Sequence, residues 1–355
     1  VRDLVTAVPT SANVKYYAQI VADKSLMRKM IKLNESIENM CYAGKEPVES
    51  IMEQTEKSMF QLLQRRTTGD YVPIKQVVLN ALDKIEKASK SKGTVTGIPT
   101  GFIDLDYKLS GFQPSDFILI AARPGMGKTS FALNIATNVA RRSDKEVAVF
   151  SLEMSKEELA SRMLSTESLV DSQKLRNGML TSEDWVRLAS GAGVLSGLQM
   201  YIDDTASITV QQIKAKLRRL KNLGLVVIDY LQLMSSTLRT DNRVTIVTEI
   251  TRQLKIMAKE LDVPVVVLSQ LSRGPEGRND KRPMMSDLRE SGSIEQDADI
   301  VMFLYRDAYY NKESQTPNVS ECIVAKNRHG GIGTIKLIWD GQFTRFSNAE
   351  MNDEG

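Results

Sequence analysis

The sequence predicts an α/β protein in which a helical segment precedes a domain built on a parallel β-sheet. Three observations support this fold class. Residues 117–142 have the pattern of a buried strand, a glycine-containing loop and a helix, the order that surrounds bound phosphates. From about residue 95 onward, short apolar runs alternate with amphipathic stretches, as parallel strands alternate with connecting helices. Over residues 1–66, by contrast, apolar residues recur only at helical spacing.

Composition and charge narrow the class of protein. The 355 residues are enough for about two domains, and 42% hydrophobic and 26% charged residues are ordinary for a globular protein. The net charge of +3 is too small to indicate nucleic-acid binding, so any such contact must come from local patches. One histidine argues against histidine metal sites and catalytic triads, and the two cysteines lack metal-ligand spacing. No apolar run reaches the roughly 18 residues of a membrane span, and no signal peptide opens the chain.

Residues 1–66 are expected to form an antiparallel pair of helices. Apolar residues recur at helical spacing over 12–33, with Ser11 as N-cap, and again over 48–63. The segment 42–47, which contains Gly and Pro, separates the two runs. Two helices that share one buried face are too small for an independent core, so we expect them to dock on another surface. An interaction module is favoured over a purely structural role.

Residues 67–94 are expected to be a linker that carries one short amphipathic helix. A polar break over 65–73 precedes it, and Lys-Ser-Lys-Gly ends it. The apolar stripe of this helix consists of Val77, Leu79, Leu82, Ile85 and Ala88. A lone amphipathic helix must bury its stripe against another surface, and a neighbouring subunit would offer one.

Residues 95–355 are expected to form the α/β domain. The predicted strands are 117–121, 146–151, 199–202, 225–229, 264–269 and 300–304. The predicted helices between them are 128–142, 156–168, 182–193, 208–222 and 245–261. After Arg306 the pattern changes: 321–326 and 333–339 flank a glycine-rich turn, and 343–346 follows. This predicts an antiparallel extension at the edge of the sheet.

The stretch after the first strand has the chemistry of a nucleotide-phosphate site. It fits the pattern G-x-x-x-x-G-K-[ST], except that Ala122 stands in the first position, where a small residue is needed. Backbone N–H groups of the loop and the helix N-terminus face the phosphates. Lys128 is expected to reach the β- and γ-phosphates, and Thr129 to ligate Mg²⁺. The residues predicted to bind the nucleotide here are Ala122, Arg123, Pro124, Gly125, Met126, Gly127, Lys128, Thr129 and Ser130.

Three later strand ends carry polar side chains that suit nucleotide hydrolysis. Asp229 ends an apolar run and is predicted to hold Mg²⁺, directly or through a water. Glu153 follows a predicted strand and is a candidate general base for the attacking water; an ordinary exposed strand-end glutamate is the alternative. Gln270 follows another strand, and its amide is predicted to hydrogen-bond the γ-phosphate. Because parallel strands end at one edge, these groups should meet the phosphate loop there.

The segment 273–293 is long, polar, basic and rich in Gly and Pro. Loops of this length inside compact domains are usually functional or disordered. Gly292 would allow close approach of a phosphodiester backbone, and the cations that would track it are Arg273, Arg278, Lys281, Arg282 and Arg289. A plain solvated loop is the alternative.

Lys326 and Arg328 stand at the end of a predicted strand, before a glycine turn. At the edge of an ATPase domain, paired cations suggest an arginine finger that stabilises transition-state charge on ATP bound by an adjacent subunit. An ordinary solvated hairpin tip is the other interpretation, and the sequence alone barely separates the two.

With the motifs described above in this order along the chain, the sequence resembles the DnaB-type hexameric replicative DNA helicases of bacteria and their phages. Residues 12–66 are similar to the helical hairpin that closes the family's N-terminal collar domain, and 73–90 to its linker helix. On this resemblance, the chain is expected to lack the globular part of that domain. The phosphate loop reads Pro-Gly-Met-Gly where many relatives have Pro-Ser-Val-Gly. The matching stretches of the ATPase domain are 97–102, 121–129, 150–155, 227–233, 268–273, 287–299 and 325–330.

The resemblance implies a ring of six RecA-like P-loop ATPase domains that bind ATP and Mg²⁺ at subunit interfaces. Such a ring moves 5′→3′ on single-stranded DNA, unwinds the duplex at the fork, and engages primase and sometimes a loader in the bacterial cytoplasm. Glu153 matches the catalytic base, Asp229 the Walker B acid and Gln270 the γ-phosphate sensor. Lys326 and Arg328 match the trans-acting cations. The loop that holds DNA phosphates in the channel is matched by Arg289, Glu290, Ser291 and Gly292.

Two other functions would use the same parts. In a RecA-like strand-pairing filament, ATP mainly gates DNA binding; the hairpin and linker helix favour a closed ring instead. In a ring that uses ATP only for assembly, hydrolysis would be dispensable; the presence of Glu153, Gln270 and Arg328 together argues against it. The motor enzyme is the favoured hypothesis.

Overall fold

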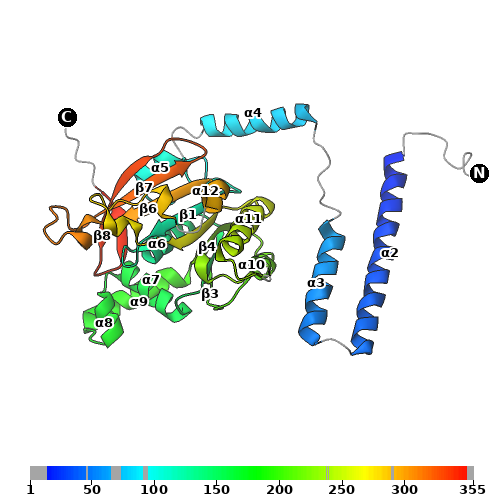
Figure 1. Cartoon of the computed structure of the whole chain (residues 1–355), viewed down its shortest axis with the longest axis horizontal. Helices are drawn as coiled ribbons and strands as arrows, with labels where there is room; N and C mark the ends of the chain where they lie inside the picture. The colour runs from blue at the N-terminus through cyan, green and yellow to red at the C-terminus, as the bar shows by residue number, and fades with distance from the viewer. Residues whose placement is uncertain are drawn as a thin grey trace, which may run out of the picture. The chain divides into compact units, whose positions relative to one another are not determined.

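The computed structural model describes residues 14–44, 47–64, 73–90, 95–236, 238, 240–288 and 292–349. The chain forms two compact units that divide between Lys87 and Ala88. The first is helical, and the second is an α/β domain (Figure 1). The helix start expected at residue 12 and its N-cap Ser11 lie outside the described residues.

In the described part of the chain, three helices precede the α/β domain: α2 (Val14–Ala43), α3 (Val48–Gln64) and α4 (Ile74–Lys90). Helices α2 and α3 contact each other and run antiparallel (Figure 1), as the periodicity predicts. Pro47 directly precedes α3, and its carbonyl oxygen accepts hydrogen bonds from the N–H groups of Ser50 and Ile51. Proline suits this position because the first N–H groups of a helix have no partner within it.

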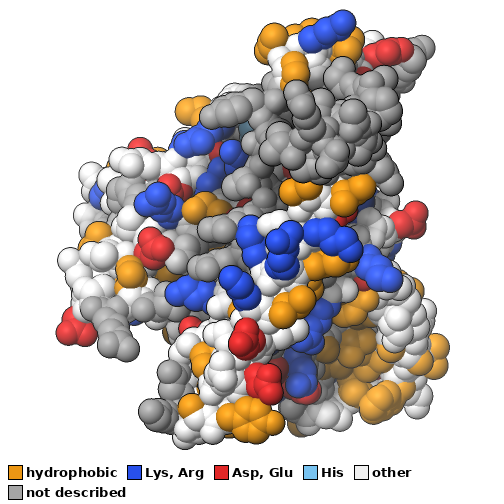
Figure 2. All heavy atoms as spheres, turned by 90° about the vertical axis from the view of Figure 1, so that its right-hand side faces the viewer, with side chains coloured by type: hydrophobic (Ala, Val, Ile, Leu, Met, Phe, Trp, Pro, Cys, Tyr) orange, Lys and Arg blue, Asp and Glu red, His pale blue; other side chains and the backbone are white. Residues whose placement is uncertain are grey.

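Several apolar side chains of these helices are exposed to solvent in the isolated chain. On α2, Val21 and Ile31 are each 65% exposed. Figure 2 shows hydrophobic side chains on the surface beside a gathering of Lys and Arg. The stripe predicted for the linker helix is present on α4, and the surface that covers it stays a prediction. Of its predicted members, Val77, Leu79, Leu82 and Ile85 are between 45% and 63% exposed, and the side chain of Ala88 is not among those described.

Within the described residues, the domain contains a nine-stranded sheet in the order β3-β2-β4-β5-β1-β6-β7-β8-β9. The first six strands along the chain are parallel: β1 (Phe117–Ala122), β2 (Glu146–Ser151), β3 (Met200–Asp203), β4 (Leu223–Asp229), β5 (Val265–Gln270) and β6 (Ile300–Tyr305). The last three extend the sheet antiparallel, as predicted: β7 (Val319–Asn327), β8 (Gly333–Asp340) and β9 (Arg345–Asn348).

Helices cover both faces of the sheet, and a hydrophobic core fills each interface (Figure 1). In β1, Ile118 and Ile120 face one core, whereas Phe117, Leu119 and Ala121 face the other. This period of two explains why the whole strand is apolar. The first core is covered by α5 (Ile103–Leu109), α6 (Lys128–Arg142), α7 (Lys156–Ser168) and α9 (Ser182–Ser196); the second by α10 (Val210–Leu217), α11 (Arg243–Leu261) and α12 (Gly292–Asp297).

The structure corrects several predicted element bounds. Helix α11 begins at Arg243 rather than 245, because the Asn242 side chain accepts hydrogen bonds from the N–H groups of Val244 and Thr245. Helix α10 ends at Leu217 rather than 222, because the chain turns there into β4. Among the described residues, the elements that periodicity missed are short: α5, α8 (Ser172–Asn177), α12, α13 (Asp307–Tyr310) and the 3-10 turns η2 (Leu231–Leu233), η3 (Gly274–Gly277) and η4 (Met285–Asp287).

Candidate nucleotide-hydrolysis site

The phosphate loop joins β1 to α6 at the C-terminal edge of the parallel strands. Gly125 and Gly127 have φ angles of +78° and +91°, which strongly favour glycine. A Cβ atom at Gly125 would lie 2.9 Å from the Tyr309 ring, and one at Gly127 would lie 2.9 Å from the Phe346 ring. Met126 between them is buried in the core. The loop is therefore fixed by its own packing, with the N-terminus of α6 beside it to stabilise an anion.

Lys128, Thr129 and Asp229 form the centre of the site. The Thr129 hydroxyl donates a hydrogen bond to Asp229 Oδ2 at 2.6 Å, and Lys128 Nζ lies 3.7 Å from Asp229 Oδ1. That Oδ1 atom is buried and has no hydrogen-bond partner among the described residues. Burial lowers the pKa of the Lys128 ammonium, while the charges of Asp229 and Glu153 act in the opposite direction. The centre thus holds a carboxylate oxygen that the described residues leave without a hydrogen-bond partner.

This donor set fits Mg²⁺. The ion takes oxygen ligands and is usually held by one or two carboxylates together with substrate phosphates and waters. Asp229 Oδ1 offers an unpartnered oxygen within the described part of the chain, and Thr129 offers a hydroxyl beside it. Among the described residues, no group of three or more His, Cys, Asp or Glu side chains could hold a metal ion. The nucleotide and water would have to supply the remaining ligands.

A cleft of about 790 Å³ lies in front of the loop and brings the predicted residues together. Glu153 and Gln270 line it with Lys128 and Thr129. Ala122 is the last residue of β1, Glu153 follows the end of β2, and Gln270 is the last residue of β5, so three strand ends contribute to the lining of the cleft. The expectation that these side chains meet at one edge of the sheet agrees with this geometry.

The turn that carries Glu153 is fixed by hydrogen bonds within the turn and by one hydrogen bond to β4. The Ser151 hydroxyl donates to the Met154 carbonyl oxygen at 2.7 Å and accepts from the Met154 N–H at 3.1 Å. The Leu152 N–H donates to the Asp229 carbonyl oxygen at 2.6 Å. Backbone hydrogen bonds therefore fix the distance between the glutamate turn and the strand that ends in Asp229.

Several residues of the cleft were missed by sequence reasoning. They come from the turn after β2, from α7 and α8, and from the β8–β9 pair, whose patterns carry no phosphate-binding motif. Arg162 and Arg176 add positive charge that suits a polyphosphate. The missed lining residues are Met154, Glu157, Glu158, Ser161, Arg162, Ser172, Leu175, Arg176, Trp339 and Thr344.

Arg123 differs from the rest of the predicted phosphate loop. Its guanidinium donates to the Leu271 carbonyl oxygen at 2.9 Å, and its Nε donates to the Glu276 carboxylate at 2.9 Å. The side chain therefore ties the phosphate loop to the segment after Gln270. We predicted Arg123 as a nucleotide ligand; the structure commits its side chain to this support, although the residue lines the cleft.

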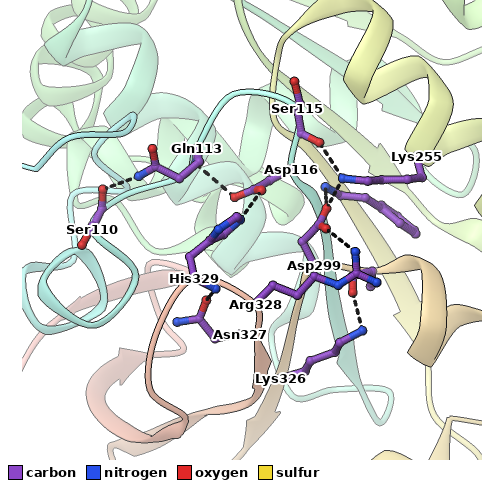
Figure 3. A network of polar contacts seen from close by, with 12 residues as sticks. Ser110, Gln113, Ser115, Asp116, Lys255, Asp299, Lys326, Asn327, Arg328 and His329 are labelled. Atoms are coloured by element: carbon purple, nitrogen blue, oxygen red, sulfur yellow. Dashed lines mark hydrogen bonds and ion pairs between the residues drawn. The ribbon is translucent and has the colours of Figure 1, made fainter. Parts of the chain in front are cut away.

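The two cations predicted to act on a neighbouring subunit lie away from the cleft. Lys326 Nζ donates to two carbonyl oxygens at the end of α12. Arg328 donates to the Gln296 carbonyl oxygen at 2.6 Å and to Asp299 Oδ1 at 3.3 Å (Figure 3). Burial lowers the pKa of Lys326, and the nearby charge of Arg328 lowers it further. The described residues that line the cleft of the same chain include neither of them.

A polar network that includes the buried carboxylates of Asp116 and Asp299 lies next to this turn (Figure 3). His329 Nε2 and Asp116 Oδ1 lie 2.7 Å apart, and Lys255 is paired with Asp299 at 2.5 Å. Burial raises the pKa of Asp116, although its hydrogen bond with His329 lowers it. The sequence analysis uses the single histidine only as an argument against histidine metal sites and catalytic triads. No local sequence motif indicates that His329 pairs with the buried Asp116.

The described part of the basic segment 273–293 corrects one prediction. Arg278 makes a two-pronged ion pair with Asp287, with N–O distances of 3.0 and 2.7 Å. Arg282 pairs in the same way with Glu321, at 2.7 and 2.6 Å. The side chains of these two arginines therefore make ion pairs within the chain, and the prediction that they bind a DNA backbone is not supported. Of the predicted DNA ligands, Arg289, Glu290 and Ser291 lie outside the described residues, and Gly292 is the first residue of α12.

Comparisons with known proteins agree with this geometry. Residues 97–348 match the family model described as the DnaB-like helicase C terminal domain. The chain is 51% identical over 352 residues to the replicative DNA helicase DnaC of Bacillus subtilis (strain 168), a match that covers 98% of this chain and 78% of that protein. The chain belongs to the DnaB-like helicase family. The replicative DNA helicase DnaB of Geobacillus stearothermophilus is likewise 51% identical, with the same coverage.

Two solved structures share the fold. One, described as an ATPase domain, is 43% identical, with a TM-score of 0.76 over 79% of this chain and 100% of that one. The other, a DnaB-like replicative helicase whose structure was described with its interactions with primase, is 38% identical, with a TM-score of 0.82 over 98% of this chain and 82% of that one. The fold is RecA-like, as predicted, and the protein is an ATP-dependent replicative DNA helicase. None of the described helices has the length and apolarity to cross a membrane.

Proposed function

We propose that this helicase works as a ring of six copies that binds ATP with Mg²⁺ between subunits. The ring moves 5′→3′ on single-stranded DNA and separates the duplex at the replication fork, in the cytoplasm. The observation that carries the hydrolytic part is the meeting of Lys128, Thr129, Asp229, Glu153 and Gln270 around one cleft. Family membership supports the ring, its polarity and its DNA substrate.

Each residue of the cleft has one task in this proposal. The phosphate loop and Lys128 bind the β- and γ-phosphates, because N–H groups and an ammonium face that volume. Glu153 accepts the proton of the water that attacks the γ-phosphorus, as the bond to the β–γ bridging oxygen breaks. Bound beside Thr129 and Asp229, Mg²⁺ would neutralise charge on the phosphate oxygens. Gln270 hydrogen-bonds the γ-phosphate, so its contact is lost when phosphate leaves.

Lys326 and Arg328 complete the site of the neighbouring copy. Their position away from the cleft of their own chain supports this role, as does the half-exposed Arg328 side chain. To act there, they must exchange the carbonyl oxygens of α12 for phosphate oxygens. A phosphate can compete for these cations because it is a charged acceptor, whereas the carbonyl oxygens are neutral, and because a guanidinium can bind it with two parallel hydrogen bonds.

Residues 289–292 hold the DNA backbone in the channel. Their place supports this: they connect Leu288, at the end of the internally paired loop, to the start of α12. Because Lys326 and Arg328 bond the far end of the same helix, α12 joins the DNA loop to the proposed trans-acting cations. Arg289 and the backbone N–H groups of Glu290, Ser291 and Gly292 are proposed to contact phosphates.

The helical pair α2–α3 engages primase and, in some settings, a loader. The exposed apolar side chains of α2 leave surface for a partner. One structural relative carries the description of interactions with primase, which supports the same partner here.

Fork unwinding tests the proposed function. Two partial duplexes would be compared, one with a single-stranded 5′ tail on the loading strand and one with a single-stranded 3′ tail. We expect ATP- and Mg²⁺-dependent unwinding of the first, and none by Glu153→Gln, which still binds ATP. The matched control Glu183→Gln, on the exposed surface of α9, should unwind like wild type. Preference for the 3′ tail, or full activity of Glu153→Gln, would overturn the proposal.

A further inference from the structure

Strand β5 extends beyond its neighbour β4. The β4–β5 ladder ends with the pair Ile228 and Val267. On its other side, β5 stays paired with β1 as far as Ala122 and Gln270. Within the described sheet, the edge of Gln270 that faces β4 therefore has no strand partner for its N–H and C=O groups, and unpaired backbone groups at such a place are costly.

A side-chain amide takes the place of the missing strand. Gln232, in the turn η2, accepts a hydrogen bond from the Gln270 N–H through Oε1 at 3.3 Å. Its Nε2 donates to the Gln270 carbonyl oxygen at 3.4 Å and to the Ser269 hydroxyl at 2.9 Å. A primary amide carries the same donor and acceptor as a peptide group, so it can continue a β-ladder by one step.

Gln232 is itself held firmly. It lies three positions after Asp229, in a turn closed by the hydrogen bond from the Leu233 N–H to the Tyr230 carbonyl oxygen at 3.1 Å. The neighbouring Leu231 is completely buried and anchors the turn in the core. The Arg243 guanidinium, at the start of α11, donates to the Gln232 carbonyl oxygen. The amide thus links the strand end that carries Asp229 to the strand end that carries Gln270.

We propose that Gln232 is a positioning residue for nucleotide hydrolysis, which fixes the backbone of Gln270 so that its side chain meets the γ-phosphate. The inference rests on the proposed role of Gln270. Gln232 itself is not among the described residues that line the cleft, so it acts through its neighbour. Its loss should therefore slow turnover without weakening nucleotide binding, because the phosphate loop and Lys128 remain intact. Misplacement of a catalytic group by about 1 Å can cost up to about a hundredfold in rate.

The test compares Gln232→Ala, Gln232→Met, Gln270→Ala and the double variant Gln232→Ala/Gln270→Ala in steady-state ATP hydrolysis with single-stranded DNA. We expect both Gln232 variants to lower kcat about tenfold or more, with KM for ATP changed less than about twofold. The Met variant keeps the length of the side chain and removes only its hydrogen bonds. In the double variant, loss of Gln232 should add nothing to the loss of Gln270.

The control is Gln212→Ala, which also removes a glutamine amide bonded to a backbone N–H, at the start of α10; it should keep kcat. Wild-type turnover by Gln232→Met, or additive losses in the double variant, would overturn the inference while the role of Gln270 stands. Full turnover by Gln270→Ala would instead overturn the proposed sensor, and the inference with it. Thermal unfolding midpoints near wild type show that the variants are folded.

Discussion

The nucleotide cleft and the Lys326–Arg328 turn both present cations, but the two regions differ in what those cations meet. In the cleft, Lys128 lies 3.7 Å from a buried Asp229 oxygen that has no hydrogen-bond partner in the described part of the chain. At the turn, both side chains already donate to carbonyl oxygens of their own chain. The cleft is prepared for ligands from outside, whereas the turn is satisfied from within.

This difference indicates an order of events. The cleft can bind nucleotide as soon as it arrives, because Lys128 Nζ lies 3.7 Å from Asp229 Oδ1, beyond hydrogen-bond distance, and need not give up a hydrogen bond to that atom. The turn must first release hydrogen bonds to α12. Hydrogen bonds to charged groups contribute about 1.5–3 kcal/mol each, so only a strongly charged acceptor brought close, such as a phosphate, would replace them.

The largest effect is expected on the cleft side of the comparison. Glu153→Gln should lower the rate of ATP hydrolysis about 10²–10⁴-fold, because the attacking water loses its proton acceptor. ATP affinity should stay near wild type, since the amide has the same shape and the phosphate loop is unchanged. Rapid-quench hydrolysis and equilibrium binding of a labelled nucleotide would measure the two quantities. Loss of binding in parallel with loss of rate would contradict the assigned role.

A second effect concerns the under-satisfied carboxylate. Asp229→Asn should raise the Mg²⁺ concentration needed for half-maximal hydrolysis about tenfold or more, because a neutral amide is a weaker ligand for a hard cation. Titration of the ATPase rate with Mg²⁺ at fixed ATP would show it. Asp203→Asn, whose carboxylate pairs with Lys216 on the surface, serves as a control. If Asp229→Asn required the same Mg²⁺ concentration as wild type, the proposal that Asp229 holds the ion would be contradicted.

Much of the cleft could be predicted because its parts sit at strand ends. The phosphate loop, Asp229, Glu153 and Gln270 each follow an apolar run, and the rules of parallel sheets place such ends together. Arg176 could not be found, because α8 is too short for periodicity to reveal. The sequence also cannot show which basic side chains form ion pairs within the chain. Arg278 was therefore predicted to contact DNA, whereas it pairs with Asp287.

A smaller effect concerns the Lys326–Arg328 turn, because this turn can act only when a neighbouring copy of the chain is present. Leu82→Glu places a charge on the exposed apolar face of α4. If that face packs against another subunit, the concentration for half-assembly should rise about tenfold, with little change in the unfolding temperature of the α/β domain. Sedimentation velocity over a concentration series would measure it, with Gln76→Glu on the same helix as control. Equal assembly of both variants would argue against a docked linker helix.

The smallest effect lies outside both regions and shows what a purely structural ion pair does. Lys174, together with backbone and hydroxyl groups of Thr181, holds the pKa of Asp184 well below its usual value. The stabilisation is complete above the ordinary pKa of an aspartate and is lost as pH falls toward the lowered one. Lys174→Met should therefore lower the melting temperature by about 1–3 °C at pH 6, and by less at pH 3. A constant difference across this range would contradict the pairing, whereas ATP turnover should not change.

The most direct test of a site shared between copies is a mixing experiment. ATPase rates would be measured with and without single-stranded DNA for wild type, Glu153→Ala, Arg328→Ala and an equimolar mixture of the two variants. If Arg328 acts on the nucleotide held by a neighbouring copy, mixed rings contain some interfaces with both wild-type residues. The mixture should then exceed either variant alone and respond to DNA. A rate no higher than the average of the two variants would contradict the trans-acting assignment.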